Sequence, residues 1–359
     1  MAQAGKSRWK NRAGSFLLLF FSLSISALTG EIILRLMGHR GAPMSIINHT
    51  YPVDDPILDW RHVQNLEYQV GKVLYTFNAS GFRDVDHAVE KPPGIKRIVV
   101  LGDSVTNGYG VEWERVFSHI LQSQLGGQIE IINIAAGGLN TPQEVHLFEQ
   151  EGLAYNPDLV ILNFILNDSD FYSSFKAAQR YNAEKDAKIG LLNLKINPRI
   201  KRVLKSSALI YFIKERVENL KSRLLGKEET DYFVSIWGKA ENRQKVTSGF
   251  DKLQVLQEEN HFDVLVIIWP LITDYRHYRF AFIHQWVEEE AENRGFSTID
   301  LLPRFSRIPY RDLQVTAEDN IHPNALGHKI GAEVFLSWYH NARYKLHFNK
   351  KKSPVFIYQ

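Results

Sequence analysis

From Arg97 onward, short runs of apolar residues alternate with longer amphipathic stretches. The short runs are rich in Val and Ile and are apolar on both faces, which is typical of strands in a buried parallel sheet. They read RIVVLGD, IEIINIA, DLVILNFILND, FDVLVIIWP and FSTIDLL. Amphipathic stretches such as ERVFSHILQSQLG and HQWVEEEAENRG lie between them, and each ends in a glycine that can stop a helix. This alternation predicts a three-layer α/β/α fold around a parallel sheet.

A different pattern occupies the start of the chain. No charged residue occurs from Ala13 to Gly30, and four basic residues without an acid precede this stretch. Eighteen residues would form a helix about 27 Å long, close to the roughly 30 Å hydrocarbon core of a bilayer. We predict an uncleaved transmembrane signal-anchor helix over 13–36, with a cytoplasmic basic segment over 1–12 and an extracytoplasmic remainder. A cleaved signal peptide and a buried core helix are the alternatives.

Changes in composition set the other boundaries. An N-terminal extension over 37–95 is rich in turn formers and aromatic residues, and it ends in EKPPGIKR. The main domain is predicted over 96–342, followed by a basic C-terminal tail over 343–359. Residues 173–250 interrupt the alternation with a basic, helical pattern, which indicates a helical insertion. The insertion is either a solvated cap without a ligand role, or a lid, a substrate-guiding surface or a membrane-surface contact.

Composition excludes several kinds of chemistry. The chain has no cysteine, so disulfides, thiolate metal sites and cysteine nucleophiles are absent. The formal net charge is +3, and without the four basic residues near the N-terminus about −1 remains, so no nucleic-acid partner is expected. His277 and His284 with Asp274 lack a recognised ligand spacing, and we predict neither a metal site nor a cofactor.

Polar residues directly follow several of the predicted strands or precede the last helix. Active-site groups of an open parallel sheet lie beyond the carboxyl ends of its strands, so these residues are expected to meet. They are Ser104 after the first strand, Gly137 and Gly138 after the second, Asn167 and Asp168 after the third, and Asp319 and His322 before the last helix.

These residue types suit acyl transfer. Ser104 is a weak nucleophile until a base removes its proton, and the imidazole of His322 is the candidate base. Asp319, three residues earlier, could accept the other ring N–H and stabilise the imidazolium. The backbone N–H groups of Ser104 and Gly138 and the amide of Asn167 could form an oxyanion hole. This hypothesis requires Ser104 and His322, more than two hundred positions apart, to meet within hydrogen-bond reach.

Four short motifs carry a family resemblance. LGDS at 101–104, NIAAGGLNT at 133–141, LND at 166–168 and DNIHPN at 319–324 resemble, in order and spacing, the motif blocks of SGNH hydrolases, the GDSL lipase/esterase family. The resemblance implies a flavodoxin-like parallel sheet. It also implies Ser104 as nucleophile, Asp319 and His322 as its partners, and Gly138, rather than Gly137, with Asn167 as oxyanion donors. NASGFRD, at residues 78–84, is similar to the lead-in of membrane-anchored bacterial members.

The motifs depart from the family pattern at two positions. Ile165 stands where the third block usually has glycine, and Ala135 stands where the second block often has one. Neither change removes a catalytic atom, but both could narrow the floor of the pocket.

We therefore predict a single-pass anchored serine esterase that cleaves an ester through a Ser-His-Asp mechanism. Small O-acyl groups on an envelope carbohydrate or a lipid are the predicted substrate class, because the domain would be tethered beside that material. One alternative is an O-acyltransferase that uses the same triad to modify an envelope glycan. The other is a catalytically inactive binding module on the same fold.

Overall fold

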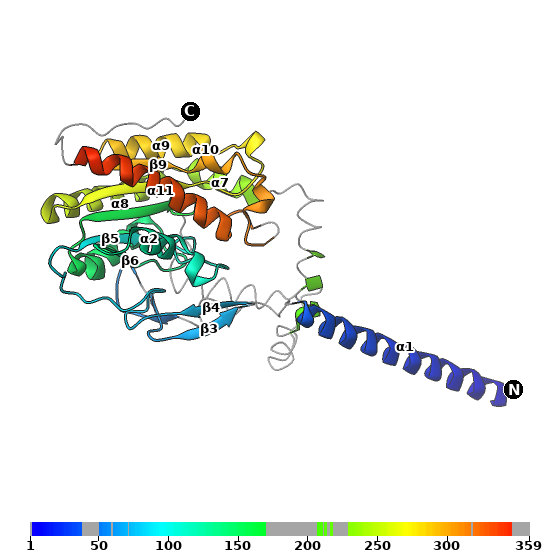
Figure 1. Cartoon of the computed structure of the whole chain (residues 1–359). Helices are drawn as coiled ribbons and strands as arrows, with labels where there is room; N and C mark the ends of the chain where they lie inside the picture. Colours follow the sequence, from blue (N-terminus) through cyan, green and yellow to red (C-terminus); the bar gives the residue numbers. More distant parts are fainter. Residues whose placement is uncertain are drawn as a thin grey trace. The chain divides into compact units, whose positions relative to one another are not determined.

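The computed structural model describes residues 2–37, 50–58, 60–70, 72–169, 207–210, 212–213, 216–217, 229–316 and 319–346 (Figure 1). The chain forms two compact units. Residues 1–44 and 187–228 make up the smaller unit, and residues 45–186 and 229–359 make up the larger one. Between 173 and 228, the predicted insertion lies outside the described residues except at 207–210, 212–213 and 216–217. Residues 347–359 of the C-terminal tail also lie outside them.

A parallel sheet of five strands forms the centre of the larger unit, with strand order β6-β5-β7-β8-β9. The strands are β5 (Lys96–Leu101), β6 (Ile129–Asn133), β7 (Leu159–Ile165), β8 (Asp263–Trp269) and β9 (Ser297–Asp300). They coincide with the five apolar runs of the sequence. The prediction of a parallel α/β sheet is thus confirmed.

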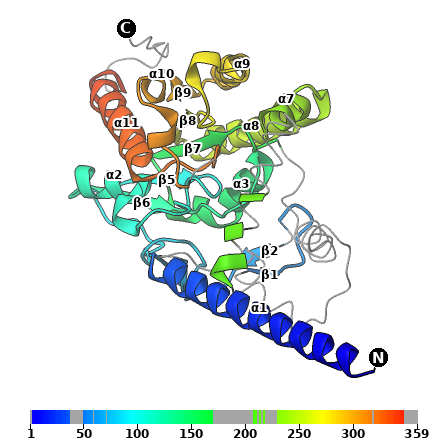
Figure 2. The same ribbon diagram turned by 90° about the vertical axis from the view of Figure 1, so that its right-hand side faces the viewer.

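Helices cover both faces of this sheet (Figure 1, Figure 2). They are α2 (Phe117–Leu125), α3 (Thr141–Leu147), α7 (Glu229–Trp237), α8 (Ala240–Asn260), α9 (Ala281–Glu292), α10 (Leu302–Phe305) and α11 (Ala325–Leu346). Neighbouring residues of a strand point to opposite faces, so each strand fills two cores. Val99 and Leu101 belong to a buried cluster with residues of α3, α7, α8 and α9. Ile98 and Val100 belong to a second cluster with residues of α2, α10 and α11.

Helix α8 crosses residue 250, where the sequence placed the end of the insertion. Val246, Phe250 and Leu253 on this helix are fully buried in the core cluster beside β7 and β8. The part of the segment from Ala240 to residue 250 therefore packs on the sheet within a core helix.

The N-terminal extension contributes two antiparallel pairs of strands to the larger unit. β1 (Thr50–Pro52) pairs with β2 (Trp60–His62), and β3 (Glu67–Val70) pairs with β4 (Val73–Thr76). Val73, Tyr75 and Phe77 form a small buried cluster of their own.

Side chains occupy the free edge of the sheet along β6. The amide of Gln122 accepts a hydrogen bond from the N–H of Ile131 (2.7 Å) and donates one to the carbonyl of Ile129 (3.1 Å). The carboxylate of Asp84 accepts from the N–H of Asn133 (2.6 Å). These bonds engage backbone groups that could otherwise pair with another strand, which is a recognised protection against edge-to-edge association.

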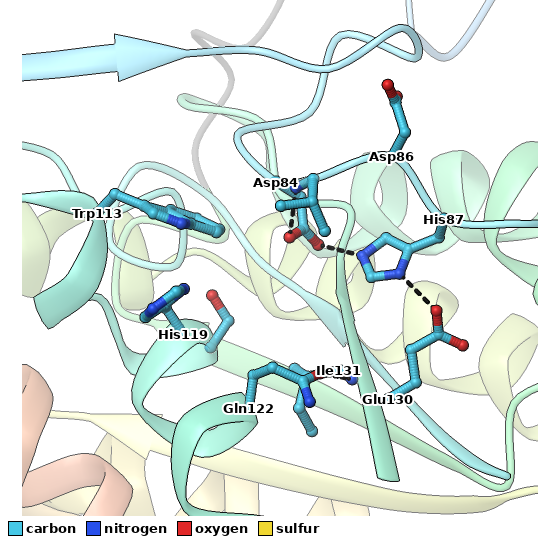
Figure 3. A pocket seen from close by; sticks show the side chains of 10 residues that line it. Asp84, Asp86, His87, Trp113, His119, Gln122, Glu130 and Ile131 are labelled. Carbon is cyan, nitrogen blue, oxygen red and sulfur yellow. Dashed lines mark hydrogen bonds and ion pairs between the residues drawn. The ribbon is translucent and has the colours of Figure 1, made fainter. Parts of the chain in front are cut away.

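A cavity of about 330 Å³ lies beside this edge (Figure 3). His87 stands between Asp84 (3.1 Å) and Glu130 (2.7 Å), and Glu130 also binds the buried Arg97 (2.7 Å). Burial alone would lower the pKa of His87, but the two carboxylates raise it above its ordinary value. These groups neutralise one another and hold the N-terminal extension against β6.

The smaller unit contains α1 (Ala2–Leu36). Its segment Leu17–Leu36 is long and apolar enough to cross a membrane, by length and composition. Its large apolar side chains are mostly exposed, unlike those of a core helix.

Candidate active site

A tight turn follows β5 and carries Ser104. Gly102 has a φ of +152°, and a Cβ there would lie 2.0 Å from Oγ1 of Thr106, so only glycine fits this close approach. Asp103 follows it and is fully buried, with a carboxylate oxygen that accepts from the N–H of Val105 (2.8 Å). Ser104 is partly exposed, just beyond the carboxyl end of β5.

The structure brings Ser104, His322 and Asp319 together. Oγ of Ser104 lies 2.8 Å from Nε2 of His322, across 218 positions of sequence. Nδ1 of His322 lies 3.0 Å from each carboxylate oxygen of Asp319. The hydroxyl, imidazole and carboxylate thus form a continuous hydrogen-bonded chain, which is the geometry of a Ser-His-Asp triad.

Asp319 is oriented by its own loop. One of its oxygens also accepts from the backbone N–H groups of Ile321 (3.1 Å) and His322 (2.9 Å). Burial would raise the pKa of Asp319, but the hydrogen bonds and the charge of His322 lower it below its ordinary value. The carboxylate is therefore ionised at neutral pH and can stabilise an imidazolium.

The loop that carries Asp319 and His322 is fastened at both ends. The N–H of Ile272, just after β8, donates to the carbonyl of Asn320 (2.7 Å). At the start of α11, the side-chain oxygen of Asn324 accepts from the N–H groups of Leu326 (2.9 Å) and Gly327 (3.3 Å). The end of a strand and the start of a helix thus determine where the imidazole lies.

Two predicted oxyanion donors have unused backbone N–H groups. Within the described residues, the N–H groups of Ser104 and Gly138 donate to no protein acceptor. Gly138 is exposed in a left-handed conformation, with φ +86°, whereas Gly137 is buried. An unpaired N–H at such a position can bind a substrate oxygen without first breaking a bond within the protein.

The third predicted donor, Asn167, is already held on one side. Its amide nitrogen donates to a carboxylate oxygen of Asp103 (2.8 Å). A side-chain amide has two N–H donors, so this bond leaves one of them. Asp103 therefore links the amide of Asn167 to the turn that carries Ser104.

Two further carboxyl groups are buried near Asp103. Glu144 is 2% exposed, and neither of its carboxyl oxygens has a partner among the described residues. Asp168 is fully buried and accepts from the N–H of Ile165 (3.1 Å). Burial first, and then the neighbouring carboxylates, raise the pKa of both Glu144 and Asp168 well above their ordinary values.

Ile165, at the position of the expected glycine, is itself buried in the core cluster on the α2 side of the sheet. Ala135 is also buried, and its N–H donates to the side chain of Asn133 (3.1 Å). Both side chains therefore lie within the packed protein.

Arg83, in the NASGFRD motif, binds the loop that follows Ser104. Its guanidinium is 1% exposed and donates to the carbonyls of Asn107 (2.9 Å), Gly108 (2.6 Å) and Val111 (2.8 Å). It also lies 4.2 Å from the ring centre of Tyr75. Although NASGFRD stood out in the sequence, nothing there indicated that its arginine would bind the loop that follows Ser104.

The same loop places an aromatic ring at the site. Tyr109 is 39% exposed, and its ring centre lies 4.5 Å from that of His322. The neighbouring N–H of Gly110 donates to the hydroxyl of Tyr75 on β4 (2.6 Å). The N-terminal extension thus contributes to the position of a residue that contacts the imidazole.

Comparison with known proteins agrees with the motifs. Residues 100–330 match the GDSL-like lipase/acylhydrolase family, and the chain belongs to this family. It is accordingly a hydrolase that acts on ester bonds. No curated protein sequence matches the chain significantly.

Several solved structures are similar to this chain at low sequence identity. An acetyl xylan esterase is 15% identical, with 67% of this chain and 98% of that chain covered and a TM-score of 0.41. A two-domain esterase active on acetylated mannans is 14% identical, with 70% and 50% covered and a TM-score of 0.40. A member of the lipolytic G-D-S-L family from Veillonella parvula is 14% identical, with 68% and 98% covered and a TM-score of 0.39.

Proposed function

We propose that Ser104 is the nucleophile of this ester hydrolase, that His322 is its general base and acid, and that Asp319 orients the imidazole. The observation that carries this assignment is the 2.8 Å contact between Oγ of Ser104 and Nε2 of His322, continued to Asp319 at 3.0 Å. Membership of the family gives the reaction class, and this contact supports the choice of these three residues.

The reaction proceeds in two halves. As Oγ of Ser104 bonds to the ester carbonyl carbon, Nε2 of His322 takes the hydroxyl proton. Collapse of the tetrahedral intermediate breaks the bond to the alcohol oxygen, which receives that proton and leaves an acyl-serine. Water, deprotonated by His322, then attacks the acyl-serine, and the acid departs as Ser104 regains its proton.

The developing oxyanion binds to the N–H groups of Ser104 and Gly138 and to the amide of Asn167. Removing one such donor costs about 3 to 4 kcal/mol of transition-state stabilisation in other enzymes. In this chain the hydrogen bond that Asn167 donates to Asp103 orients the third donor before substrate arrives.

Labelling with a fluorophosphonate tests the nucleophile. We expect the wild type to be labelled at Ser104 and the Ser104→Ala variant to remain unlabelled. Ser123→Ala, at an exposed position on α2, is the control and should label like the wild type. Absence of labelling in folded wild-type protein would favour the inactive binding module.

The proposed substrate is a small O-acyl ester on a carbohydrate. The exposed ring of Tyr109 beside His322 offers an aromatic face that a sugar ring can pack against. A panel of acyl esters of increasing length and of acetylated glycans, assayed with the wild type and with Ser104→Ala, tests this class. Adding a glycan acceptor and analysing the products distinguishes hydrolysis from acyl transfer.

We also propose that α1 anchors the enzyme in a membrane, with its basic N-terminus in the cytoplasm and the hydrolase domain outside. A reporter fused after Gln359 that functions only outside the cytoplasm should be active. Activity of a cytoplasm-only reporter at the same position would reverse the orientation.

A further inference from the structure

A single acidic residue of α1 binds the start of a second helical segment within the smaller unit. The carboxylate of Glu31 accepts hydrogen bonds from the hydroxyl of Ser207 (2.8 Å) and from the N–H groups of Ala208 (3.0 Å) and Leu209 (2.9 Å). Arg35, one turn further along α1, also donates to Glu31 (2.6 Å). Glu31 is thus the point at which the apolar helix and the 207–217 region are joined.

This contact forms hydrogen bonds to polar groups that would be unfavourable if they lay unpaired near a bilayer. The first N–H groups of a helix have no acceptor within that helix, and an isolated carboxylate in an apolar span is expensive. Here Glu31 takes two of those N–H groups, while the hydroxyl of Ser207 accepts from the N–H of Ile210 (3.2 Å). The two segments therefore satisfy each other's polar groups.

The second segment carries an exposed apolar face. Residues 208–210, 212–213 and 216–217 are helical. Ile210, Ile213 and Val217 are 41%, 51% and 44% exposed, and their spacing of three and four positions places them on one side of a helix. We refer to these three side chains as the 210–217 face.

The sequence around this face is basic. Residues 201–223 contain seven Lys or Arg and two Glu. A helix with an apolar face and a basic surround binds the boundary between headgroups and acyl chains, especially where the lipids are anionic. Ile32, Ile33 and Leu36, near the end of α1, are also exposed, so both segments of the unit present aliphatic side chains.

We propose that the 210–217 face inserts into the lipid surface beside the end of α1, held there by Glu31. This inference rests on the proposal that α1 spans a membrane. The 210–217 face then contacts the surface of the bilayer rather than another protein. The enzyme would then be attached at two adjacent points instead of one.

The absence of cysteine makes a direct test possible. Full-length protein with one introduced cysteine, Ile213→Cys, is labelled with an environment-sensitive fluorophore and placed in vesicles that contain phosphatidylglycerol and a spin-labelled quencher lipid. Leu23→Cys within α1 reports the anchor, and Val255→Cys, 45% exposed on α8 of the larger unit, reports a position in water. We expect the probe at 213 to be quenched several-fold more than the probe at 255.

The comparison separates this inference from the anchor itself. Quenching at 23 with none at 213 overturns the surface contact and leaves the anchor standing, and it is also the result expected if a protein partner covers the face. Absence of quenching at both positions overturns both the surface contact and the membrane anchor.

Adding Glu31→Ala to Ile213→Cys should lower quenching at 213 while quenching at 23 in the matched Leu23→Cys variant persists. Undiminished quenching at 213 would contradict the role of Glu31. Ester hydrolysis by each variant confirms that the enzyme is folded.

Discussion

The candidate site and a second group of side chains share the same connectivity of carboxylate, imidazole and hydroxyl. In the second group, Nδ1 of His284 lies 2.8 Å from Oδ1 of Asp300, and its Nε2 lies 2.8 Å from the hydroxyl of Tyr278. Asp300 ends strand β9 and His284 is on helix α9, so this group also lies near the carboxyl ends of the strands.

The two groups differ in access and in what surrounds the hydroxyl. The side chain of His284 is 2% exposed, whereas that of His322 is 18% exposed. The hydroxyl of Tyr278 accepts from the N–H of Leu271 (3.1 Å), and burial raises its pKa well above the ordinary value of a tyrosine. The buried group therefore links the loop that contains Tyr278 to helix α9 and strand β9 through hydrogen bonds. Exposure and unpaired N–H donors distinguish the Ser104 group.

Replacing each imidazole gives the largest expected contrast. His322→Gln should lower kcat by about 10⁶-fold, as loss of the base does in other serine hydrolases, with little change in unfolding temperature. His284→Gln should keep kcat within a few-fold of the wild type but lower the unfolding temperature, because a buried hydrogen-bonded group is disrupted. Steady-state kinetics and thermal unfolding of both variants measure this contrast. Equal losses of activity would show that the buried group takes part in the reaction.

Replacing the carboxylate of each group, Asp319 and Asp300, tests the same contrast with a smaller expected loss of kcat. Asp319→Asn preserves the size of the side chain but removes the charge that stabilises the imidazolium, so kcat should fall by about 10⁴-fold. The matched variant Asp300→Asn should change kcat little. Kinetics over a range of pH are needed, because activity recovered at high pH would show that Asp319 acts only through the protonation state of His322. A normal kcat in Asp319→Asn at all pH values would contradict its assignment.

A third difference between the two groups is the set of proposed oxyanion donors, which lies beside Ser104. Asn167→Ala removes an amide that Asp103 holds in place, and kcat should fall by about 10²- to 10³-fold with a smaller change in KM. Asn293→Ala serves as a control, because it removes an exposed side-chain amide just after α9 without removing a proposed oxyanion donor. A rise in KM alone in Asn167→Ala would indicate ground-state binding instead.

The sequence predicts the sheet and the order of its motifs because both depend on local patterns. Apolar runs of Val and Ile mark β5 to β9, and residues at the ends of parallel strands must meet at one edge. This reasoning placed Ser104 and His322 within reach although 218 positions separate them.

Other features depend on contacts that no local pattern records. Arg83 binds three carbonyls more than twenty positions away, and such bonds between a side chain and the backbone leave no trace in residue type. Glu144 follows Pro142 and Gln143 at the start of α3, where an acid ordinarily suits an exposed first turn. Its burial becomes visible only when α3 is packed against the sheet.

The smallest expected effect concerns protein stability and comes from the buried carboxyl of Glu144. It contrasts with the carboxylate of Asp300 in the second group. Asp300 is paired with His284, but neither oxygen of Glu144 has a partner among the described residues. The pKa of Glu144 is raised in the folded state, so the folded protein binds more protons than the unfolded chain above pH about 4.5. Its contribution therefore lowers stability as pH rises.

Glu144→Gln removes this titration while keeping the shape of the side chain. We expect the variant to be more stable than the wild type at pH 8, by about 1 to 3 kcal/mol, and the difference to shrink toward pH 4, where Glu144 is neutral in both states. Denaturant unfolding at several pH values measures it, with Glu259→Gln at an exposed position of α8 as the control. A parallel pH dependence in the wild type and Glu144→Gln would mean that Glu144 ionises freely in the folded protein. The buried carboxyl of Glu144 would then impose no pH-dependent penalty on the stability of the fold.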